Sequence, residues 1–219
     1  MDEMRWSEPP QSEDGQPTIK NHSVTHFNGH LYCFGGYDGR RNHQTLLLYN
    51  IANQQWLQTT DSDVKPRSEV KVEGTPPPGR NGHTATLATD PNDEEHGRII
   101  IIGGWLGQGP LAASDMHVLD VSSSGLRWYQ PAVKGSTPGP CNMHSADFVP
   151  ARREVYVFRG GNGREYLNDL HALHVDAYQW RKVETTGQLP QQRANHSSAY
   201  LEETAELFIF GGWCVLCLQ

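Results

Sequence analysis

One short pattern occurs four times along this chain. A histidine begins each copy, two β-rich stretches follow, and a pair of glycines ends it. The histidines are His22, His83, His144 and His196, and the glycine pairs are Gly35-Gly36, Gly103-Gly104, Gly160-Gly161 and Gly211-Gly212. A period of roughly 50 residues is typical of repeat architectures. The repeat therefore constrains the fold more than any other feature, and it moves the functional question from an active site to a surface.

Each copy predicts four antiparallel strands. In the first, residues 22–27 alternate polar and apolar side chains, as a half-buried strand does. Asn28-Gly29 then favours a two-residue hairpin, because both turn positions take positive φ. Residues 30–34 return as the second strand, residues 45–50 form the third, and Trp56 begins the fourth. We expect Trp128 and Trp180 at the equivalent place, all three largely buried because their rings are the largest apolar surfaces in their strands.

A second marker, a glycine followed by a proline, recurs between the copies. It lies at residues 15–17, 74–76, 135–138 and 187–190. Trp6 precedes the first marker much as Trp128 precedes the third. The sequence therefore predicts that the chain begins on the fourth strand of a repeat unit.

These residues resemble the kelch repeat, whose signature is a strand ending in Gly-Gly, then a spaced Tyr, then a Trp. The corresponding pairs are Tyr49 with Trp56, Leu119 with Trp128, and His174 with Trp180. The stretches 77–83 and 190–196 are similar to the lead-in of kelch proteins that lack a BTB domain. The resemblance implies an all-β fold, a kelch-type β-propeller of four-stranded antiparallel blades around a central channel. In such a propeller the glycine pairs let neighbouring backbones approach, so Gly104→Val and Gly161→Val are expected to destabilise the fold.

We expect a single kelch-repeat domain over residues 1–219. Its parts are a partial strand and linker (1–16), repeat 1 (17–62), repeat 2 (63–133), repeat 3 (134–185), a partial repeat 4 (186–213) and an irregular tail (214–219). Two arrangements stay open. The strand at Trp6 could close a four-bladed ring with the last half-blade, or the chain is a shortened form of a six- or seven-bladed propeller and leaves an open arc. The open arc is favoured, because the resemblance to kelch proteins implies a ring of six or seven blades.

Composition excludes several classes of function. The net charge of −7 argues against nucleic acid as the main partner. No apolar run approaches the length of a membrane span, and the acidic N-terminus does not resemble a signal peptide, so we expect the cytoplasm or the nucleus. Four irregularly placed cysteines do not form a disulfide framework. Cys214 and Cys217 have metal or redox spacing but lack a second pair, and we expect two thiols without a site.

Neither a metal nor a catalytic site is expected. The four repeated histidines would ring the channel rather than converge, so hydrogen bonding at the edge of each blade is the better interpretation. The acidic residues 90–97 lack the pattern of a calcium loop and predict a solvated hairpin tip. The chain also lacks a nucleophile elbow, a phosphate-binding loop and a dinucleotide fingerprint. We therefore expect no cofactor and no enzymatic activity.

Arg159 departs from the repeat. The other copies carry Phe34, Ile102 and Phe210 directly before the glycine pair. A charged residue at an apolar strand end needs a partner or a cavity. Two interpretations stay open: a cation near the channel mouth that binds a carboxylate, or a local bulge whose arginine reaches solvent.

The loops that follow the glycine pairs and the loops that lead into the blades are expected to share one face. The candidate partner-binding residues on them are Tyr37, Asp38, Arg40, Arg80, Asn81, Trp105, Arg159, Asn162, Arg164, Arg193, Asn195 and Trp213. Aromatic and arginine side chains are enriched in binding hot spots. This face therefore predicts a protein or peptide partner with an acidic group or a carboxylate end.

The leading hypothesis is a non-catalytic protein-interaction module, such as a substrate receptor or adaptor in a ubiquitin-ligase or cytoskeletal complex. Two alternatives follow from the resemblance. One is an actin-associated scaffold. The other is a propeller enzyme similar to galactose oxidase, which needs converging metal ligands or a covalent aromatic-thiol cofactor that the sequence does not display.

Overall fold

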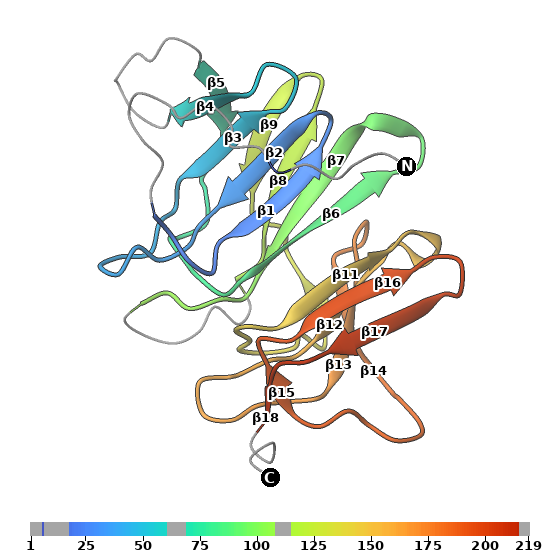
Figure 1. Cartoon of the computed structure of the whole chain (residues 1–219). Helices are drawn as coiled ribbons and strands as arrows, with labels where there is room; N and C mark the ends of the chain where they lie inside the picture. Colours follow the sequence, from blue (N-terminus) through green and yellow to red (C-terminus); the bar gives the residue numbers. More distant parts are fainter. Residues whose placement is uncertain (1–5, 7–17, 61–68, 108–114, 215–219) are drawn as a thin grey trace.

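The computed structural model describes residues 6, 18–60, 69–107 and 115–214, and within them the regular structure is β apart from one 3-10 turn, η1 (Pro150–Arg152). Three complete four-stranded blades follow one another along the chain (Figure 1). Blade 1 holds β1 (Ser23–Phe27), β2 (His30–Phe34), β3 (Leu46–Asn50) and β4 (Gln55–Thr60). Blade 2 holds β6 (Thr84–Asp90), β7 (Asp93–Ile102), β8 (His117–Ser122) and β9 (Gly125–Tyr129). Blade 3 holds β11 (Ser145–Val149), β12 (Glu154–Phe158), β13 (Leu170–His174) and β14 (Gln179–Val183).

Neighbouring strands inside each blade are antiparallel, so the expected blade architecture is confirmed. The fourth copy contains a hairpin, β16 (Ser197–Leu201) and β17 (Glu206–Phe210). Beside it, β15 (Arg193–Ala194) pairs with β18 (Trp213–Cys214).

Two further strands explain the glycine-proline marker. β5 (Glu69–Glu73) runs parallel to both β4 and β9, which joins blades 1 and 2 into one nine-stranded sheet. β10 (Lys134–Gly135) runs parallel to β14 in the same way. A Cβ atom on Gly74 would lie 2.0 Å from the carbonyl oxygen of Trp128, so only glycine fits where the chain crosses the fourth strand.

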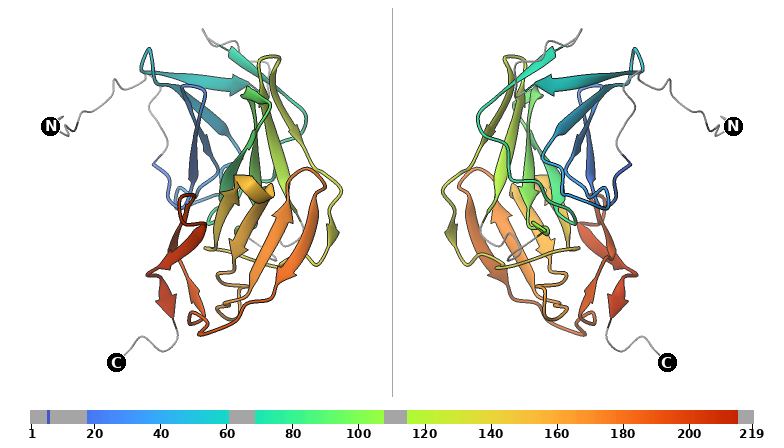
Figure 2. Two further views of the ribbon diagram at one scale, coloured as in Figure 1. Left: turned by 90° about the vertical axis from the view of Figure 1, so that its right-hand side faces the viewer. Right: turned by 90° about the vertical axis from the view of Figure 1, so that its left-hand side faces the viewer.

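The sheets are arranged as an open arc with blade 1 at one end and the β16–β17 hairpin at the other (Figure 2). No described strand pairs this hairpin with blade 1. Trp6, expected on a strand, is 99% exposed and belongs to none, while residues 1–5 and 7–17 lie outside the described part of the chain.

The apolar core lies between successive blades. One cluster, between blades 1 and 2, includes Phe34, Leu119 and Trp128, and another, between blades 2 and 3, includes Val155 and Trp180. Trp128 and Trp180 are buried as expected. Trp56 is only half-buried, because it contacts Tyr49 on its own blade while blade 1 has no described blade before it.

The strand register corrects two assignments made from sequence. Trp180 pairs with Leu173, not with His174. The last paired residues of the second strands are Phe34, Ile102, Phe158 and Phe210, which lie opposite Ser23, Thr84, Ser145 and Ser197. Arg159 therefore does not replace an apolar strand residue. It occupies the place of the first glycine, and the Gly160-Gly161 pair is shifted by one position.

The histidines that begin the copies join neighbouring blades. His83 Nε2 lies 2.9 Å from Ser23 Oγ, and His144 Nε2 lies 2.9 Å from Thr84 Oγ1. The third interface repeats the contact between His196 and Ser145 at 2.9 Å. The hydrogen bonds expected inside each blade thus cross from one blade to the next, and all three rings are buried.

A backbone hydrogen bond accompanies each of these contacts. The residue before each histidine has positive φ, and its N–H donates to the carbonyl of the equivalent residue in the preceding blade. The three bonds run from Gly82 to Asn21 (2.9 Å), from Met143 to Gly82 (2.8 Å) and from Asn195 to Met143 (2.8 Å). The blades are therefore connected by a repeated pair of rungs, one from side chains and one from the backbone.

Acid should weaken these interfaces. Burial lowers the pKa of His83 and His144 to about 3 and that of His196 to about 4, with nearby positive groups adding to the effect. From about pH 6.5 downward the unfolded chain binds protons that the folded chain does not. We expect the free energy of unfolding to fall as the pH is lowered from 7 to 5, by up to about 1.4 kcal/mol per pH unit for each histidine. His96, whose pKa is raised mainly by its hydrogen bond to Asp120, acts in the opposite sense.

The measurement is urea denaturation across this pH range, on the wild type and on the double variant His83→Asn/His144→Asn. Asparagine keeps a hydrogen-bond donor but does not titrate, so the variant should show a flatter pH dependence. An unchanged slope would assign the acid sensitivity to other groups.

The shifted glycine pair gives a second prediction. A Cβ atom on Gly160 would lie 2.4 Å from the carbonyl oxygen of Asn142, whereas one on Gly161 would meet nothing closer than 3.7 Å. Gly160→Ala should destabilise the fold by roughly 2 kcal/mol, and Gly161→Ala should change stability by less than about 0.5 kcal/mol. This reverses the expectation from sequence that position 161 is sterically critical. Equal urea midpoints for the two variants would contradict the register.

Candidate functional site

A surface pocket opens between blades 1 and 2, at the strand ends that carry the glycine pairs. We call it the rim pocket, and its volume is about 860 Å³. Its lining residues are Lys20, Asn21, Tyr37, Arg40, Arg41, Asn42, Pro78, Gly79, Asn81, Trp105, Leu106 and Gly107. Four residues expected at a partner-binding face, Tyr37, Arg40, Asn81 and Trp105, thus come together in one place.

Backbone pairing positions the two aromatic residues. Tyr37 exchanges two hydrogen bonds with Lys20, at 3.0 and 2.9 Å, directly after the glycine pair of blade 1. Trp105 exchanges two with Asn81, at 3.1 and 2.7 Å, at the equivalent place in blade 2. The same local geometry therefore presents one aromatic ring from each blade.

Asn42 links the two halves of the rim pocket. Its side-chain amide donates to the carbonyl of Trp105 at 2.9 Å and accepts a hydrogen bond from Asn81 Nδ2 at 2.8 Å. Lys20, Arg41 and Asn42 were not singled out from sequence, because they lie in polar loop segments without a pattern of their own. Only their position across from blade 2 makes them part of the site.

The loop of blade 1 holds two arginines at the pocket. Asp38 Oδ1 accepts hydrogen bonds from the backbone N–H groups of Arg40 (2.7 Å) and Arg41 (2.8 Å), and Oδ2 contacts His43 Nε2 at 2.8 Å. The two backbone hydrogen bonds and then His43 hold the pKa of Asp38 well below its usual range. Within the described residues, neither arginine forms an ion pair.

The rim pocket is therefore cationic. Lys20, Arg40 and Arg41 line it, and no carboxylate does so among the residues that the structure describes. The sequence as a whole carries a net charge of −7. A local reversal of sign of this kind attracts and orients acidic ligands.

Arg80 does not belong to this surface, so its expected role in binding is wrong. The side chain is fully buried, and Nη2 lies 2.5 Å from Asp115 Oδ2. Its other nitrogens donate to the carbonyls of Gly103 (3.0 Å) and Pro78 (3.2 Å). Burial alone would raise the pKa of Asp115, but His117 and Arg80 outweigh it and lower the pKa. Arg80 is a structural ion-pair partner.

Arg159 plays the corresponding part in blade 3. Its Nη1 lies 3.0 Å from Asp169 Oδ2, and Nη2 donates to the carbonyl of Pro140 at 3.1 Å. Cys141 occupies the position that Arg80 has in blade 2, three residues before the histidine. The guanidinium group is therefore supplied from the end of β12 instead. Of the two interpretations left open, the carboxylate-binding cation is the closer, but the carboxylate comes from its own blade.

The remaining candidates lie outside the rim pocket. Asn162 Oδ1 accepts hydrogen bonds from the N–H groups of Arg164 and Glu165, both at 2.9 Å, which shapes an exposed loop of blade 3. Arg193 donates to the carbonyls of Gly211 and Gln191 and repeats the backbone contacts of Arg80. Asn195 belongs to the backbone rung, and Trp213 is exposed and pairs with Ala194.

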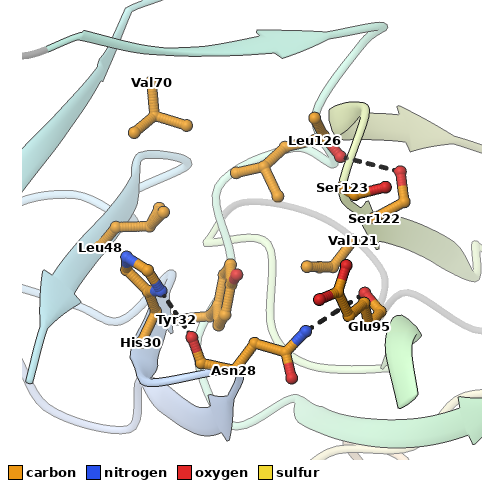
Figure 3. A pocket seen from close by; sticks show the side chains of 11 residues that line it. Asn28, His30, Tyr32, Leu48, Val70, Glu95, Val121, Ser122, Ser123 and Leu126 are labelled. Carbon is orange, nitrogen blue, oxygen red and sulfur yellow. Dashed lines mark hydrogen bonds between the residues drawn. The ribbon is translucent and has the colours of Figure 1, made fainter.

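A second cavity lies at the opposite strand ends, between the hairpins of blades 1 and 2 (Figure 3). Its walls include Tyr32, Leu48, Val121 and Leu126, which belong to the apolar cluster between the blades. Across its mouth, Asn28 Nδ2 donates to the carbonyl of Glu95 at 3.2 Å. Polar side chains line it as well, among them His30, Glu95 and Ser122.

Among the described residues, no group of three or more His, Cys, Asp or Glu side chains could hold a metal ion. No helix in them is long and apolar enough to cross a membrane. Cys141 is a free thiol whose pKa is raised by burial to about 12. Cys214 is disulfide-bonded, so the expectation of a free thiol there is wrong. Cys217 lies outside the described residues.

Comparison with known proteins decides the family. The KLHDC2/KLHL20/DRC7 Kelch-repeats domain matches residues 94–217, and the Kelch motif matches residues 19–61. The chain belongs to the kelch-repeat family. The match to the Kelch-repeats domain begins in β7 and covers blade 3 and the last hairpin. The match to the Kelch motif covers blade 1.

The relatives share this domain in longer proteins. Kelch domain-containing protein 3 of Homo sapiens is 25% identical over 206 residues, which are 91% of this chain and 50% of that protein. Kelch domain-containing protein 1 of Mus musculus is 27% identical over 218 residues, covering 90% of this chain and 49% of that protein. Serine/threonine-protein phosphatase BSL2 of Arabidopsis thaliana is 30% identical over 166 residues, but the match covers only 14% of that protein. The chain spans half or less of the length of these relatives.

Kelch-repeat domains generally bind other proteins, and the relatives support a kelch protein of the non-BTB type.

Loss of the buried Arg80–Asp115 pair should be costly. Arg80→Ala leaves the Asp115 carboxylate without its closest cationic partner, and we expect a loss of about 3 kcal/mol of unfolding free energy. Arg164→Ala removes an exposed arginine and should cost less than about 0.5 kcal/mol. Urea denaturation of both variants measures the difference. A wild-type midpoint for Arg80→Ala would restore Arg80 as a candidate binding residue.

Proposed function

We propose that this kelch-repeat chain is a non-catalytic receptor or adaptor module that binds an acidic or carboxylate-ended peptide segment of a partner protein in the rim pocket. The observation that carries the proposal is the combination of two aromatic rings and three cationic side chains around one pocket, where no carboxylate stands among the described lining residues. A larger assembly, such as a ubiquitin-ligase or cytoskeletal complex in the cytoplasm or nucleus, would use the module to select that partner.

The pocket has the composition of a binding site for a peptide. The ring of Trp105, 38% exposed, can pack against an apolar side chain, and Tyr37 is half-buried beside it. Aromatic anchors of this kind supply much of the affinity in protein interfaces. The exposed Arg40 and Arg41 would set the orientation of the peptide through its negative charge.

The site is also held in place before any ligand arrives. Asn42 and Asn81 hydrogen-bond across the two blades, and the turn around Asp38 orders the loop that carries both arginines. A preformed site loses less conformational entropy on binding. Neither the actin-associated scaffold nor the enzyme has a specific observation of its own in the described residues.

The test is fluorescence polarisation with labelled peptides that differ in acidic content and in a free or amidated C-terminus. We expect acidic peptides to bind, more weakly as salt is raised, because exposed charges are screened. Arg40→Glu and Trp105→Ala should each weaken binding by about tenfold, roughly 1.4 kcal/mol.

Two charge-matched variants serve as controls. Arg127→Glu changes an exposed arginine on β9, and Arg164→Glu changes one in the blade 3 loop. Both should bind as the wild type does. A peptide that depends on Arg164 but not on Arg40 would place the site on blade 3, and the absence of binding by any acidic peptide would contradict the proposal.

A further inference from the structure

The cavity between the hairpins of blades 1 and 2 holds a buried polar group that blade packing leaves unused. We call it the hairpin cavity, and its volume is about 300 Å³, at the lower end of the range for small-molecule sites. Tyr32, on β2, directs its ring into this cavity (Figure 3), although the residue as a whole is only 5% exposed. Its hydroxyl has no hydrogen-bond partner among the described residues. Burying a hydroxyl without a partner is costly, so a ligand that pairs with it is favoured.

Apolar side chains form the wall around this hydroxyl. The strands β3, β5, β8 and β9 supply one each, which are Leu48, Val70, Val121 and Leu126. Together with β2, these strands belong to the nine-stranded sheet that joins blades 1 and 2. The shape of the hairpin cavity is therefore fixed by backbone pairing, and its wall suits the apolar chain or ring of a small molecule.

The imidazole of His30 lines the cavity but has no free N–H group. Its Nδ1 lies 2.9 Å from the carbonyl oxygen of Asn28, which can only accept a hydrogen bond, so Nδ1 carries the hydrogen. Its Nε2 then accepts a hydrogen bond from the side-chain amide of Asn50 at 3.1 Å. In this arrangement the ring is neutral, and it offers an anionic ligand neither a charge nor a donor.

Glu95 carries the negative charge of the cavity, and no lysine or arginine stands among the described lining residues. Its backbone is held on both sides, because its N–H donates to Asp93 Oδ1 at 3.0 Å and its carbonyl accepts from Asn28 Nδ2 at 3.2 Å. The exposed carboxylate forms no ion pair within the described part of the chain. A carboxylate beside an apolar wall matches an ammonium group on an apolar body.

We propose that the hairpin cavity binds a small organic amine. The ammonium group pairs with the Glu95 carboxylate and donates a hydrogen bond to the Tyr32 hydroxyl. The apolar part of the molecule packs against Leu48, Val121 and Leu126. The ammonium group can belong to a free amine or to a lysine side chain, since the chemistry of recognition is the same.

The hairpin cavity is separate from the rim pocket. The two lie at opposite strand ends of blades 1 and 2 and share no lining residue. Their charges are also opposite, because arginine and lysine line the rim pocket and Glu95 lines the hairpin cavity. The amine site is therefore tested independently of the proposed peptide binding.

Methyl NMR of the full chain, labelled at leucine and valine, tests the proposal with three probes that share an aromatic ring. Phenethylamine carries a positive head group, phenethyl alcohol a neutral one and phenylacetate a negative one. We expect phenethylamine to bind with a dissociation constant of about 1 mM or less and to shift the methyl signals of the cavity wall. Phenethyl alcohol should bind about fivefold more weakly, and phenylacetate should cause no shift there.

Two substitutions test the two polar partners. Glu95→Gln removes the charge and keeps the size, so it should weaken phenethylamine binding about fivefold and leave phenethyl alcohol binding unchanged. Glu94→Gln is the matched control, because it removes the neighbouring exposed carboxylate, which does not line the cavity, and it should leave binding unchanged. Tyr32→Phe removes only the hydroxyl and should weaken phenethylamine binding about threefold. Its urea midpoint should not fall, because the hydroxyl has no described partner to lose.

A fourth probe, Nα-acetyl-lysine methylamide, identifies the source of the ammonium group. Tighter binding than phenethylamine assigns the site to a lysine side chain of a partner protein, and weaker binding assigns it to a free amine. The proposal is overturned if about 10 mM phenethylamine leaves the wall methyl signals in place. Equal binding of the first three probes would make the cavity a non-selective apolar gap and overturn it too. So would equal effects of Glu94→Gln and Glu95→Gln, or unchanged binding by Tyr32→Phe.

Discussion

A buried histidine that reaches the hydroxyl of the preceding blade is the contact on which the arrangement of blades depends. It occurs at all three internal interfaces with the same 2.9 Å separation, and a backbone hydrogen bond beside it fixes the neighbouring residue. Burial keeps the three rings neutral near pH 7 by lowering their pKa. The apolar clusters stabilise the interfaces in proportion to the apolar surface they bury, but the hydrophobic effect does not fix the orientation of one blade against the next. The histidine–hydroxyl contact and the backbone hydrogen bond are directional, and so they determine which loops meet at the rim pocket.

The guanidinium–carboxylate pairs show that the fold preserves an interaction rather than a residue. Arg80 reaches Asp115 from the loop that leads into blade 2, while Arg159 reaches Asp169 from the far end of β12. Both carboxylates also contact the histidine two residues later, which lies on the third strand of the blade. A buried charge left unpaired is costly, so the two halves of each pair must be retained together. The position of the arginine can change as long as its charge reaches the same space.

Local sequence patterns predicted the strands of the three blades, because alternation and hairpin turns act over a few residues. They did not predict β5 and β10, each of which pairs with a fourth strand more than 40 residues further on, β5 pairing also with β4 just before it. They also misplaced Arg159, because the glycine pair of blade 3 is shifted by one and only the pairing of Phe158 with Ser145 reveals it. At the candidate site, Tyr37 and Trp105 were recognised by type. The burial of Arg80 and the bridging role of Asn42 depend on contacts between blades, which no local pattern records.

The rim pocket lies where the backbone connects two blades most continuously. β5 pairs with β4 on one side and β9 on the other, so blades 1 and 2 share a nine-stranded sheet, whereas blades 2 and 3 belong to separate sheets. The two blades that hold Tyr37 and Trp105 are thus joined by strand pairing, by the His83 rung and by the amide of Asn42. Separating them would break all three connections at once. A pocket held in this way keeps its shape without a ligand, so more of the energy of each contact with a partner contributes to affinity.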